Sequence, residues 1–434
     1  MLGRMNKIKL ILSYKFLLII PIAVLLFWQT LPMEIRPLGA NEIDIPDYAD
    51  PDLGEKLVKI GNCESCHTGP EGKPFAGGYG IKTNFGTIYS TNITPDNQTG
   101  IGFWSYEAFK RAIEKGIDRE GNHLYPAFPY YRFTAASEQD IASIYAFLKT
   151  RVEPINFNPP KTKLNFPFSF RPGLRLWNAA FLDEKKLTSE PSEDLEWSRG
   201  KYLVETLGHC GSCHSPRNVF GAEEIGQLAY SGALIGSWYA PPLKFAKSPS
   251  ISFDQNSFVN YLLDGWDKHL GIAVGPMIKV SNNLYDINED DAFAISKYLL
   301  SLSENSEILE LPIIGDYEDK IWNRATAVNS KDYLAGSKIF EKQCASCHKL
   351  NGKPSTRGFV NSINQPLPNN LIHVVLNGIK PSTGSAEKEM PDRGLMLSDD
   401  QIVQLLIFLR QKFTDQPLWK NPLKTVSMIR NEDK

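Results

Sequence analysis

The sequence predicts a mainly α-helical protein in which three similar units follow an N-terminal apolar segment. Three observations support this fold class. A Cys-x-x-Cys-His string occurs three times, a short helical pattern with a glycine precedes each string, and an amphipathic helix closes each unit. The chain has 434 residues, 42% of them hydrophobic and 22% charged, with a net charge of -2. This composition is that of a folded protein without the basic field that would attract nucleic acid.

Residues 1–40 are expected to form a membrane anchor. Four basic residues up to Lys15 precede an apolar stretch at residues 16–33, which is just long enough to span a bilayer, and no clean cleavage site follows. A cleaved signal peptide is the alternative. The basic residues should keep the N-terminus in the cytoplasm. The remaining chain would then lie on the periplasmic side of the inner membrane, or free in the periplasm if the segment is removed.

The three strings use all six cysteines of the chain, so none is left for a disulfide. Each string also contains a histidine, and together they comprise Cys63, Cys66 and His67, then Cys210, Cys213 and His214, then Cys344, Cys347 and His348. This pattern is the attachment signature of c-type haem, in which two thiols form thioethers and the histidine is the proximal ligand of the iron. We therefore expect three covalently bound haem c groups.

A zinc site or a thioredoxin-like redox site is the alternative to haem. Structural zinc would need two further ligands at matching spacing, and a thioredoxin motif makes no use of a histidine directly after its second cysteine. Covalent c-type haem is attached outside the bacterial cytoplasm, which agrees with an exported chain.

The helical patterns predict three tandem cytochrome c-type domains, at residues 50–150, 191–302 and 330–415. In each domain a helix that contains a glycine should cross the closing helix beside the haem. The glycines are Gly54, Gly200 and Gly336, and the residues that cap the closing helices are Ser137, Asn288 and Ser398. Ser398 and Gln401 have the spacing of a capping box.

The segments between and after these domains have the composition of connectors. Residues 151–190 are rich in proline and in aromatic side chains, so we expect them to pack across the domain surfaces instead of hanging free. Residues 303–329 form a second connector, and residues 416–434 form a polar tail.

Methionine is the common second iron ligand of c-type electron carriers. Met277 lies 63 residues after His214 and 11 before Asn288, a position that suits a distal ligand better than a core contact. Met390 precedes Ser398 by eight residues and is expected to serve the third haem, with Met396 as the alternative.

The first unit departs from this pattern, because no methionine lies between Met33 and Met277 and Phe128 occupies the equivalent place. Phenylalanine cannot bind iron. His123, five residues earlier, is the candidate distal ligand; an open or water-bound iron and a ligand from a neighbouring unit are alternatives, and His123 could instead contact a haem propionate. The remaining histidines are not expected to bind iron: His209, His269 and His373.

The chain has no Walker loop, no complete dinucleotide-binding fingerprint and no nucleophile elbow. The chemistry expected is therefore one-electron transfer, with the substrate oxidised by another subunit. By this reasoning the chain is an electron-transfer subunit and not an enzyme in its own right.

Several runs of sequence are similar to those of a known family: KPFAGG at residues 73–78, FGTIYSTNITPD at 85–96, HLYPAFPY at 123–130, WYAP at 238–241 and GPM at 275–277. Residues 52–413 resemble the triple-haem cytochrome c subunits of bacterial membrane-bound periplasmic dehydrogenases. The resemblance implies that a large catalytic subunit passes electrons to this chain. It also implies that the chain passes them on to membrane ubiquinone or a terminal oxidase.

The resemblance also bears on the kind of partner. Alcohol and gluconate dehydrogenase members usually have a methionine where Phe128 stands and a C-terminal membrane helix, whereas residues 425–434 are polar. Phe128, the N-terminal anchor and the run YLLDGW at 261–266 look more like cytochromes paired with molybdenum hydroxylases, which have an iron-sulfur subunit and act on aldehydes or N-heterocycles. Quinoprotein and flavoprotein dehydrogenases are alternative partners.

Two further functions stay open. The chain could be a peroxidase-like or sulfur-oxidising cytochrome with an open iron at the first haem, or the cytochrome c subunit of a terminal oxidase.

Overall fold

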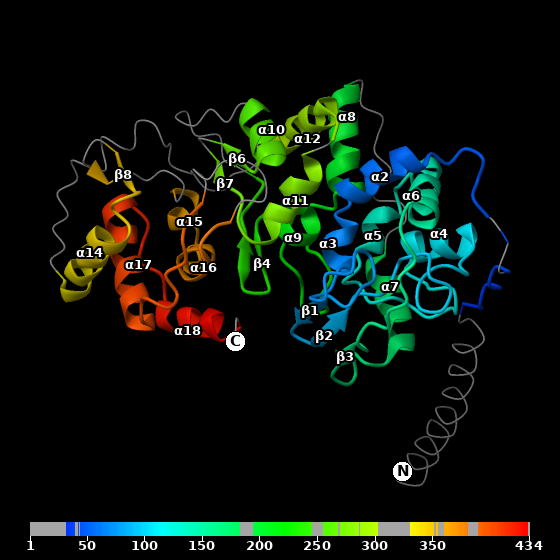
Figure 1. The fold of residues 1–434 in the computed structure, drawn as a ribbon, viewed down its shortest axis with the longest axis horizontal. Helices are drawn as coiled ribbons and strands as arrows, with labels where there is room; N and C mark the ends of the chain where they lie inside the picture. Colours follow the sequence, from blue (N-terminus) through cyan, green and yellow to red (C-terminus); the bar gives the residue numbers. More distant parts are fainter. Residues whose placement is uncertain are drawn as a thin grey trace, which may run out of the picture.

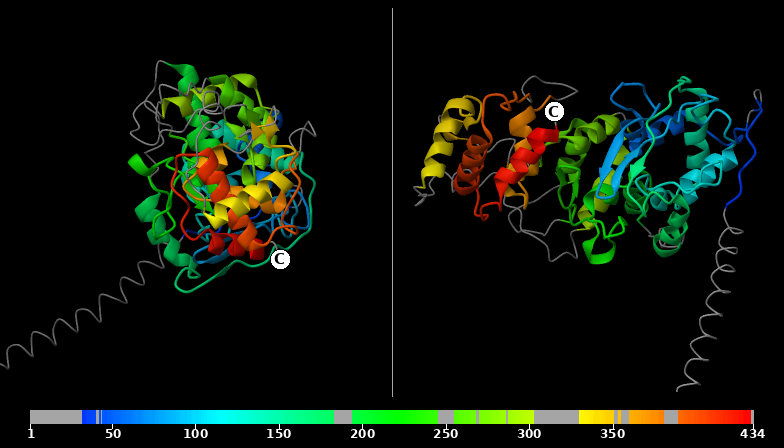
Figure 2. Two further views of the ribbon diagram at one scale, coloured as in Figure 1. Left: turned by 90° about the vertical axis from the view of Figure 1, so that its left-hand side faces the viewer. Right: turned by 90° about the horizontal axis from the view of Figure 1, so that it is seen from below.

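The computed structural model describes residues 32–39, 42, 44–182, 194–244, 255–267, 270–285, 287–302, 330–350, 353–354, 360–380 and 389–432. The three parts of the chain follow one another along the long axis: the earliest described residues lie at one end and residues 331–343 at the other, whereas the last described helix, at residues 422–432, lies nearer the middle (Figure 1 and Figure 2). Most of the expected anchor at 1–40, the whole connector at 303–329 and His269 lie outside the described residues. None of the described helices is long and apolar enough to cross a bilayer.

The first stretch of the chain combines helices with a small sheet. Its helices are α2 (Pro51–Ile60), α3 (Cys63–His67), α4 (Tyr106–Lys115), α5 (Tyr130–Phe133) and α6 (Glu138–Thr150). An antiparallel sheet of order β1-β2-β3 joins β1 (Gly80–Thr83) and β2 (Gly86–Tyr89) to β3 (Lys163–Leu164), which comes from the connector. The connector continues through the 3-10 turn η1 (Arg171–Gly173) and helix α7 (Leu174–Phe181), so it packs along the first stretch.

The second stretch begins with a helix that changes its winding. Helix α8 (Leu195–Tyr202) runs directly into the π-helical turn η2 (Leu203–Leu207), and the short helix α9 (Gly211–His214) follows. The remaining elements are the 3-10 turn η3 (Gly226–Leu228), the hairpin β4 (Ala233–Ile235) and β5 (Trp238–Ala240), α10 (Gln255–Asp264), the hairpin β6 (Trp266–Asp267) and β7 (Gly271–Ile272), α11 (Pro276–Leu284) and α12 (Glu289–Ser301).

The third stretch contains α14 (Lys331–Gln343), the hairpin β8 (Lys349–Leu350) and β9 (Lys353–Pro354), α15 (Val360–Asn364), α16 (Asn369–Asn377), α17 (Asp399–Phe413) and α18 (Pro422–Glu432). Helix α18 lies in residues 416–434, where we expected only a polar tail. Its Val426 and Ile429 are fully buried. Because these two residues are three positions apart, they lie on one face of the helix, and this face packs on the core beside α17.

Three pairs of crossing helices recur along the chain: α2 with α6, α8 with α12, and α14 with α17. At each crossing a glycine lies against the backbone of the partner helix, and a Cβ there would overlap a carbonyl oxygen. The glycine and carbonyl pairs are Gly54 with Ser143, Gly200 with Ala294, and Gly336 with Gln404. Glycine is required at these positions because the two helix axes approach so closely.

The predicted caps of the three closing helices are confirmed. The Ser137 hydroxyl accepts a hydrogen bond from the Asp140 N–H at 3.1 Å, and Asn288 caps α12. Ser398 and Gln401 form a reciprocal capping box, with bonds of 3.3 Å and 2.9 Å. Each cap satisfies N–H groups that the first helical turn leaves without an intrahelical partner.

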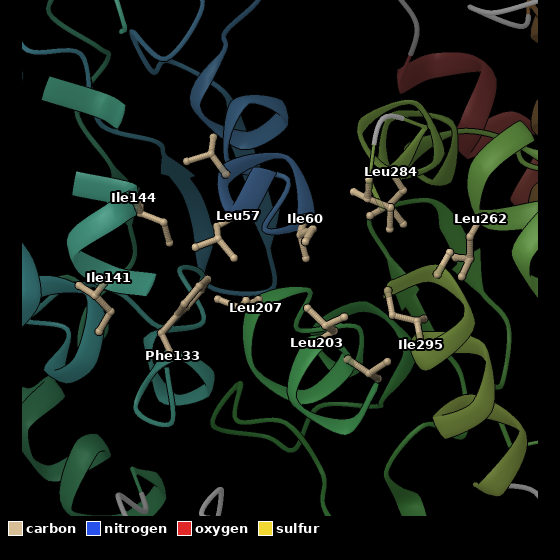
Figure 3. Packing of buried hydrophobic residues seen from close by; sticks show 14 of the residues in the cluster. Leu57, Ile60, Phe133, Ile141, Ile144, Leu203, Leu207, Leu262, Leu284 and Ile295 are labelled. Carbon is tan, nitrogen blue, oxygen red and sulfur yellow. The ribbon is translucent and has the colours of Figure 1, made fainter. Parts of the chain in front are cut away.

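The buried side chains form two hydrophobic cores. One core is continuous between the first two stretches, and Figure 3 shows Leu57 and Ile60 of α2, Phe133 of α5, and Leu203 and Leu207 of η2 close together within it. The second core lies within the third stretch and includes buried side chains of α14, α16, α17 and α18. The first two stretches are therefore one packing unit and the third is another.

Candidate functional site

The six cysteines form no disulfide, and each string places them in the same way. The first cysteine of every string is half-buried and the second is exposed: Cys63 and Cys66, Cys210 and Cys213, Cys344 and Cys347. The first string is helix α3 itself, the second overlaps α9, and the third is a turn that directly follows α14. The first cysteine of each pair is thus less accessible than the second.

Burial keeps the inner thiols protonated. It raises the pKa of Cys63 and of Cys210 to about 12, and that of Cys344 to about 11. A thioether carries no charge, so these sites suit the linked form of cysteine better than a free thiolate.

In the first string, the imidazole of His67 has one nitrogen fixed. Its Nδ1 lies 2.7 Å from the carbonyl oxygen of Thr91. A carbonyl can only accept, so Nδ1 carries the hydrogen and Nε2 keeps the lone pair that a metal requires. Burial lowers the pKa of His67, which favours the neutral ring that binds iron. Gly77, with φ of 79°, packs on the Thr91 backbone, where a Cβ would not fit.

The second string repeats this arrangement. His214 Nδ1 lies 2.6 Å from the carbonyl oxygen of Pro241, and burial again lowers the imidazole pKa. The parallel extends to the backbone, because the carbonyl oxygens of His67 and His214 each accept a hydrogen bond from a glycine with positive φ. These are Gly77 at 2.7 Å and Gly232 at 2.8 Å. Two loops of different sequence therefore present the two histidines in one geometry.

The candidate methionine ligands occupy constrained positions. Met277 is the second residue of α11, half-buried against the first core, and it follows Gly275, which has φ of 55°. Met390 pairs with Ile379 through two backbone hydrogen bonds of 2.8 Å and 3.0 Å. Met396, the alternative, is 65% exposed. In the third string, the His348 N–H is bonded to the Cys344 carbonyl at 2.9 Å.

His123 is a buried imidazole in which only one ring nitrogen has a hydrogen-bond partner. Its Nδ1 lies 3.4 Å from the Asn178 side-chain nitrogen, and its Nε2 is buried with no hydrogen-bond partner. Burial lowers its pKa, and Arg175 and Arg171 lower it further. Phe128 packs instead against Tyr130 and Phe133. The orphaned Nε2 is the feature expected of a group that awaits an iron or a propionate.

The first and second strings lie next to each other. Asn62, before Cys63, is bonded to Asn283 at 2.6 Å, and His209, before Cys210, approaches the Gly61 carbonyl at 3.2 Å. Burial raises the pKa of Tyr79, and its interactions with Cys66 and Cys213 raise it further. The third string belongs to the separate core of the third stretch.

Two contacts beside these strings were not found by sequence reasoning. Arg132 of α5 and Glu223 form an ion pair with side chains only 11% and 3% exposed, next to Gly211 of the second string. Trp238 of β5 stacks on His373 of α16, with ring centroids 4.0 Å apart and planes 7° apart. Both contacts join residues more than 90 positions apart, so no local pattern could indicate them.

Comparison with known proteins decides the family. Residues 331–409 match the model of cytochrome c oxidase, cbb3-type, subunit III. The chain is 36% identical over 406 residues to the fructose dehydrogenase cytochrome subunit of Gluconobacter japonicus, covering 88% of this chain and 82% of that one. It is 32% identical over 399 residues to the gluconate 2-dehydrogenase cytochrome c subunit of Pantoea cypripedii, covering 88% and 89%. The chain belongs to the cytochrome c subunits of bacterial dehydrogenases.

The chain is also similar to a nicotinate dehydrogenase subunit of Pseudomonas putida, with 36% identity over 417 residues. That match covers 94% of this chain and only 34% of the longer nicotinate dehydrogenase polypeptide. The relatives named as cytochrome subunits identify the chain as an electron-transfer subunit of a dehydrogenase complex. Covalent haem c is the cofactor of this family.

Proposed function

We propose that this cytochrome subunit carries three haem c groups and transfers electrons from a large dehydrogenase subunit to membrane ubiquinone or a terminal oxidase. One repeated arrangement supports this proposal. A helix whose glycine packs against the closing helix is followed by a cysteine pair, and a histidine comes directly after the second cysteine. When bound, haem c supplies a one-electron couple between ferric and ferrous iron.

The residues have distinct roles in this proposal. Each cysteine pair forms the thioethers, and His67, His214 and His348 are the proximal ligands. Met277 and Met390 are the distal ligands of the second and third haems, and His123 is that of the first. The carbonyls of Thr91 and Pro241 hold the His67 and His214 rings in one orientation. The domains are residues 50–150, 191–302 and 330–415, and residues 1–40 anchor them at the periplasmic side of the inner membrane.

A molybdenum hydroxylase with an iron-sulfur subunit is the proposed electron donor. Nicotinate is an N-heterocycle, so the similarity to a nicotinate dehydrogenase subunit supports this class of partner. Quinoprotein and flavoprotein dehydrogenases are the alternatives, supported by the similarity to the alcohol and fructose dehydrogenase subunits. Copurification of the native complex and metal analysis of its large subunit distinguish these classes.

Two other functions each have one observation in their favour. Phe128 in the place of a methionine favours an open first iron and hence a peroxidase-like or sulfur-oxidising cytochrome. The match of residues 331–409 to an oxidase subunit favours the cytochrome c subunit of a terminal oxidase. Carbon monoxide binding to the reduced protein tests the first, and copurification with a haem and copper subunit tests the second.

The haem count is tested by the mass of the denatured chain. We expect the mass of three haems on the purified protein, and two haems on a variant with Cys344→Ala and Cys347→Ala. The matched variant with Cys63→Ala and Cys66→Ala should also lose one. A denatured chain without added mass, or one whose haem leaves on acid and solvent extraction, would contradict the proposal.

A further inference from the structure

Large apolar side chains are exposed on the connector between the first two stretches. Phe166 is 86% exposed and Leu176 of α7 is 69% exposed, and Phe168 and Phe170 lie between them with large exposed fractions. Helix α7 has no fully buried residue, although its sequence LRLWNAAF is strongly apolar. Such a concentration of exposed aromatic and aliphatic side chains marks a surface that contacts something else.

This surface continues onto the loop that follows the second string. Val219 is 81% exposed and Phe220 60%. The Trp177 indole N–H donates to the Phe220 carbonyl at 3.0 Å, which fastens the loop to α7. We call Phe166, Phe168, Phe170, Leu176, Val219 and Phe220 the aromatic face.

Contacts beneath the aromatic face hold it in place. The rings of Phe85 and Phe168 lie 4.1 Å apart, which ties the connector to the hairpin of β1 and β2. The ring of Phe181 lies 6.0 Å from that of Phe220. The face is therefore a built surface and not the mobile tip of a loop.

Within the connector part of the aromatic face, the charged residues have one sign. Residues 154–182 contain no aspartate or glutamate, but they contain Lys161, Lys163, Arg171 and Arg175. Apolar and aromatic side chains framed by lysine and arginine suit the interface of an anionic phospholipid bilayer, where rings enter the headgroup layer and cations meet lipid phosphates.

The N-terminal end of the described chain lies beside the same surface. Met33 and Ile35 lie against α4 and the turn at residues 118–123: Arg111 of α4 donates to the Met33 carbonyl at 2.8 Å, and the Ile35 N–H donates to the Arg119 carbonyl at 2.9 Å. Arg171, directly before α7, donates to the His123 carbonyl of that turn at 2.7 Å. The apolar stretch 16–33 therefore ends next to the connector that carries the aromatic face.

We propose that the aromatic face rests on the surface of an anionic phospholipid bilayer, as a second contact beside the N-terminal segment. This inference rests on the membrane location in the proposed function. A docked catalytic subunit would also cover aromatic side chains, but it would not account for an acid-free connector beside an apolar stretch of membrane-spanning length. Two adjacent contacts would fix how the domains stand on the membrane.

Site-directed spin labelling tests the proposal on the full chain in vesicles of phosphatidylcholine and phosphatidylglycerol. The native cysteines are thioethers in the proposed function, so a cysteine introduced by Leu176→Cys or Val219→Cys is the one thiol that reacts. Leu395→Cys is the control, because Leu395 is fully exposed on the third stretch. We expect labels at 176 and 219 to gain accessibility to oxygen and lose it to an aqueous nickel chelate, whereas the label at 395 stays aqueous.

Two outcomes would overturn the inference. The labels at 176 and 219 could remain as aqueous as that at 395, or they could become immobilised only when the dehydrogenase subunit is added, which would identify a protein interface instead. The unsubstituted chain is the control that distinguishes failure of this inference from failure of the proposed function. If it takes up spin label, free thiols are present and the haem proposal fails, whatever the depth of the labels.

Discussion

His67 and His214 illustrate how single side chains would prepare the proposed iron sites. For each histidine, a backbone carbonyl accepts a hydrogen bond from Nδ1–H, and a glycine N–H donates to the histidine carbonyl. The ring and its backbone are therefore both fixed. A ring fixed before the metal binds loses little further entropy, and its Nε2 stays in the basic, neutral form. Burial, which lowers the pKa of both rings, acts in the same direction.

The two methionines near α17 offer a matched comparison. Met390→Ala should lower the reduction potential of one haem, because loss of a thioether ligand favours the ferric state. Met396→Ala removes a largely exposed side chain and should leave all potentials unchanged. A stepwise redox titration of both variants measures this. A lowered potential in Met396→Ala alone would exchange the two assignments.

The ion pair of Arg132 and Glu223 should matter for stability. Its members are almost fully buried, so Glu223→Gln leaves a buried guanidinium without its countercharge and should cost about 3–5 kcal/mol of unfolding free energy. Glu34→Gln is the control, because Glu34 pairs with Arg119 at the surface and should cost about 0–1 kcal/mol. Denaturant unfolding measures both, and equal effects would refute the assignment.

In the variant with Cys63→Ala and Cys66→Ala, which would lack the first haem, His123 should make stability depend on pH. Burial and two arginines lower its folded-state pKa, so the unfolded chain binds the proton more readily once the pH drops below about 6.5. The free energy of unfolding of that variant should therefore fall with acidification, and its advantage over the same variant with His123→Gln should narrow between about pH 8 and about pH 5. Parallel stability curves for the two proteins would contradict this.

The sequence was sufficient for the residues whose chemistry depends on local spacing. A cysteine pair and its histidine lie within five consecutive positions, so a role for them can be predicted without knowing the fold. Glu223 gives no such signal, because its partner Arg132 is 91 residues away. The stacking of Trp238 on His373 could not be predicted for the same reason, although the sequence WYAP at residues 238–241 was recognised as similar to the family.

At the scale of elements, the crossing glycines set the distance between helix axes. Gly54→Ala, Gly200→Ala or Gly336→Ala would press a methyl group into a backbone carbonyl, and we expect each to cost about 1–3 kcal/mol. Gly173→Ala is the control, since a Cβ there meets only the Phe170 ring at 3.5 Å. Thermal unfolding of the four variants tests this, and a cost at Gly173 equal to the others would refute it.

Helix starts were easier to predict than short strands and peripheral helices. Ser137, Asn288 and Ser398 cap their helices as expected because a cap satisfies N–H groups only two or three residues away. The two-residue hairpins have no comparable pattern. Helix α18 was missed because only Val426 and Ile429 of this helix are buried in the core, and a segment with so few buried apolar residues resembles a tail.

At the scale of the whole molecule, the two cores should behave as separate cooperative units. Leu203→Ala, in the core shared by the first two stretches, and Leu405→Ala, in the third, should each cost about 2–5 kcal/mol. We expect two calorimetric transitions, with each variant lowering a different one. A single transition lowered by both would mean that the cores unfold together.

Because the two cores are separate, the third stretch could be removed without opening the core of the first two. A coding sequence that lost the third stretch would still specify a complete interior for the first two, because none of the described side chains of the shared core comes from beyond residue 302. The newly uncovered surface would be the small one around Trp238. Removal of the third stretch should therefore leave the shared core intact, whereas separation of the first two stretches would expose the apolar side chains of that core to water.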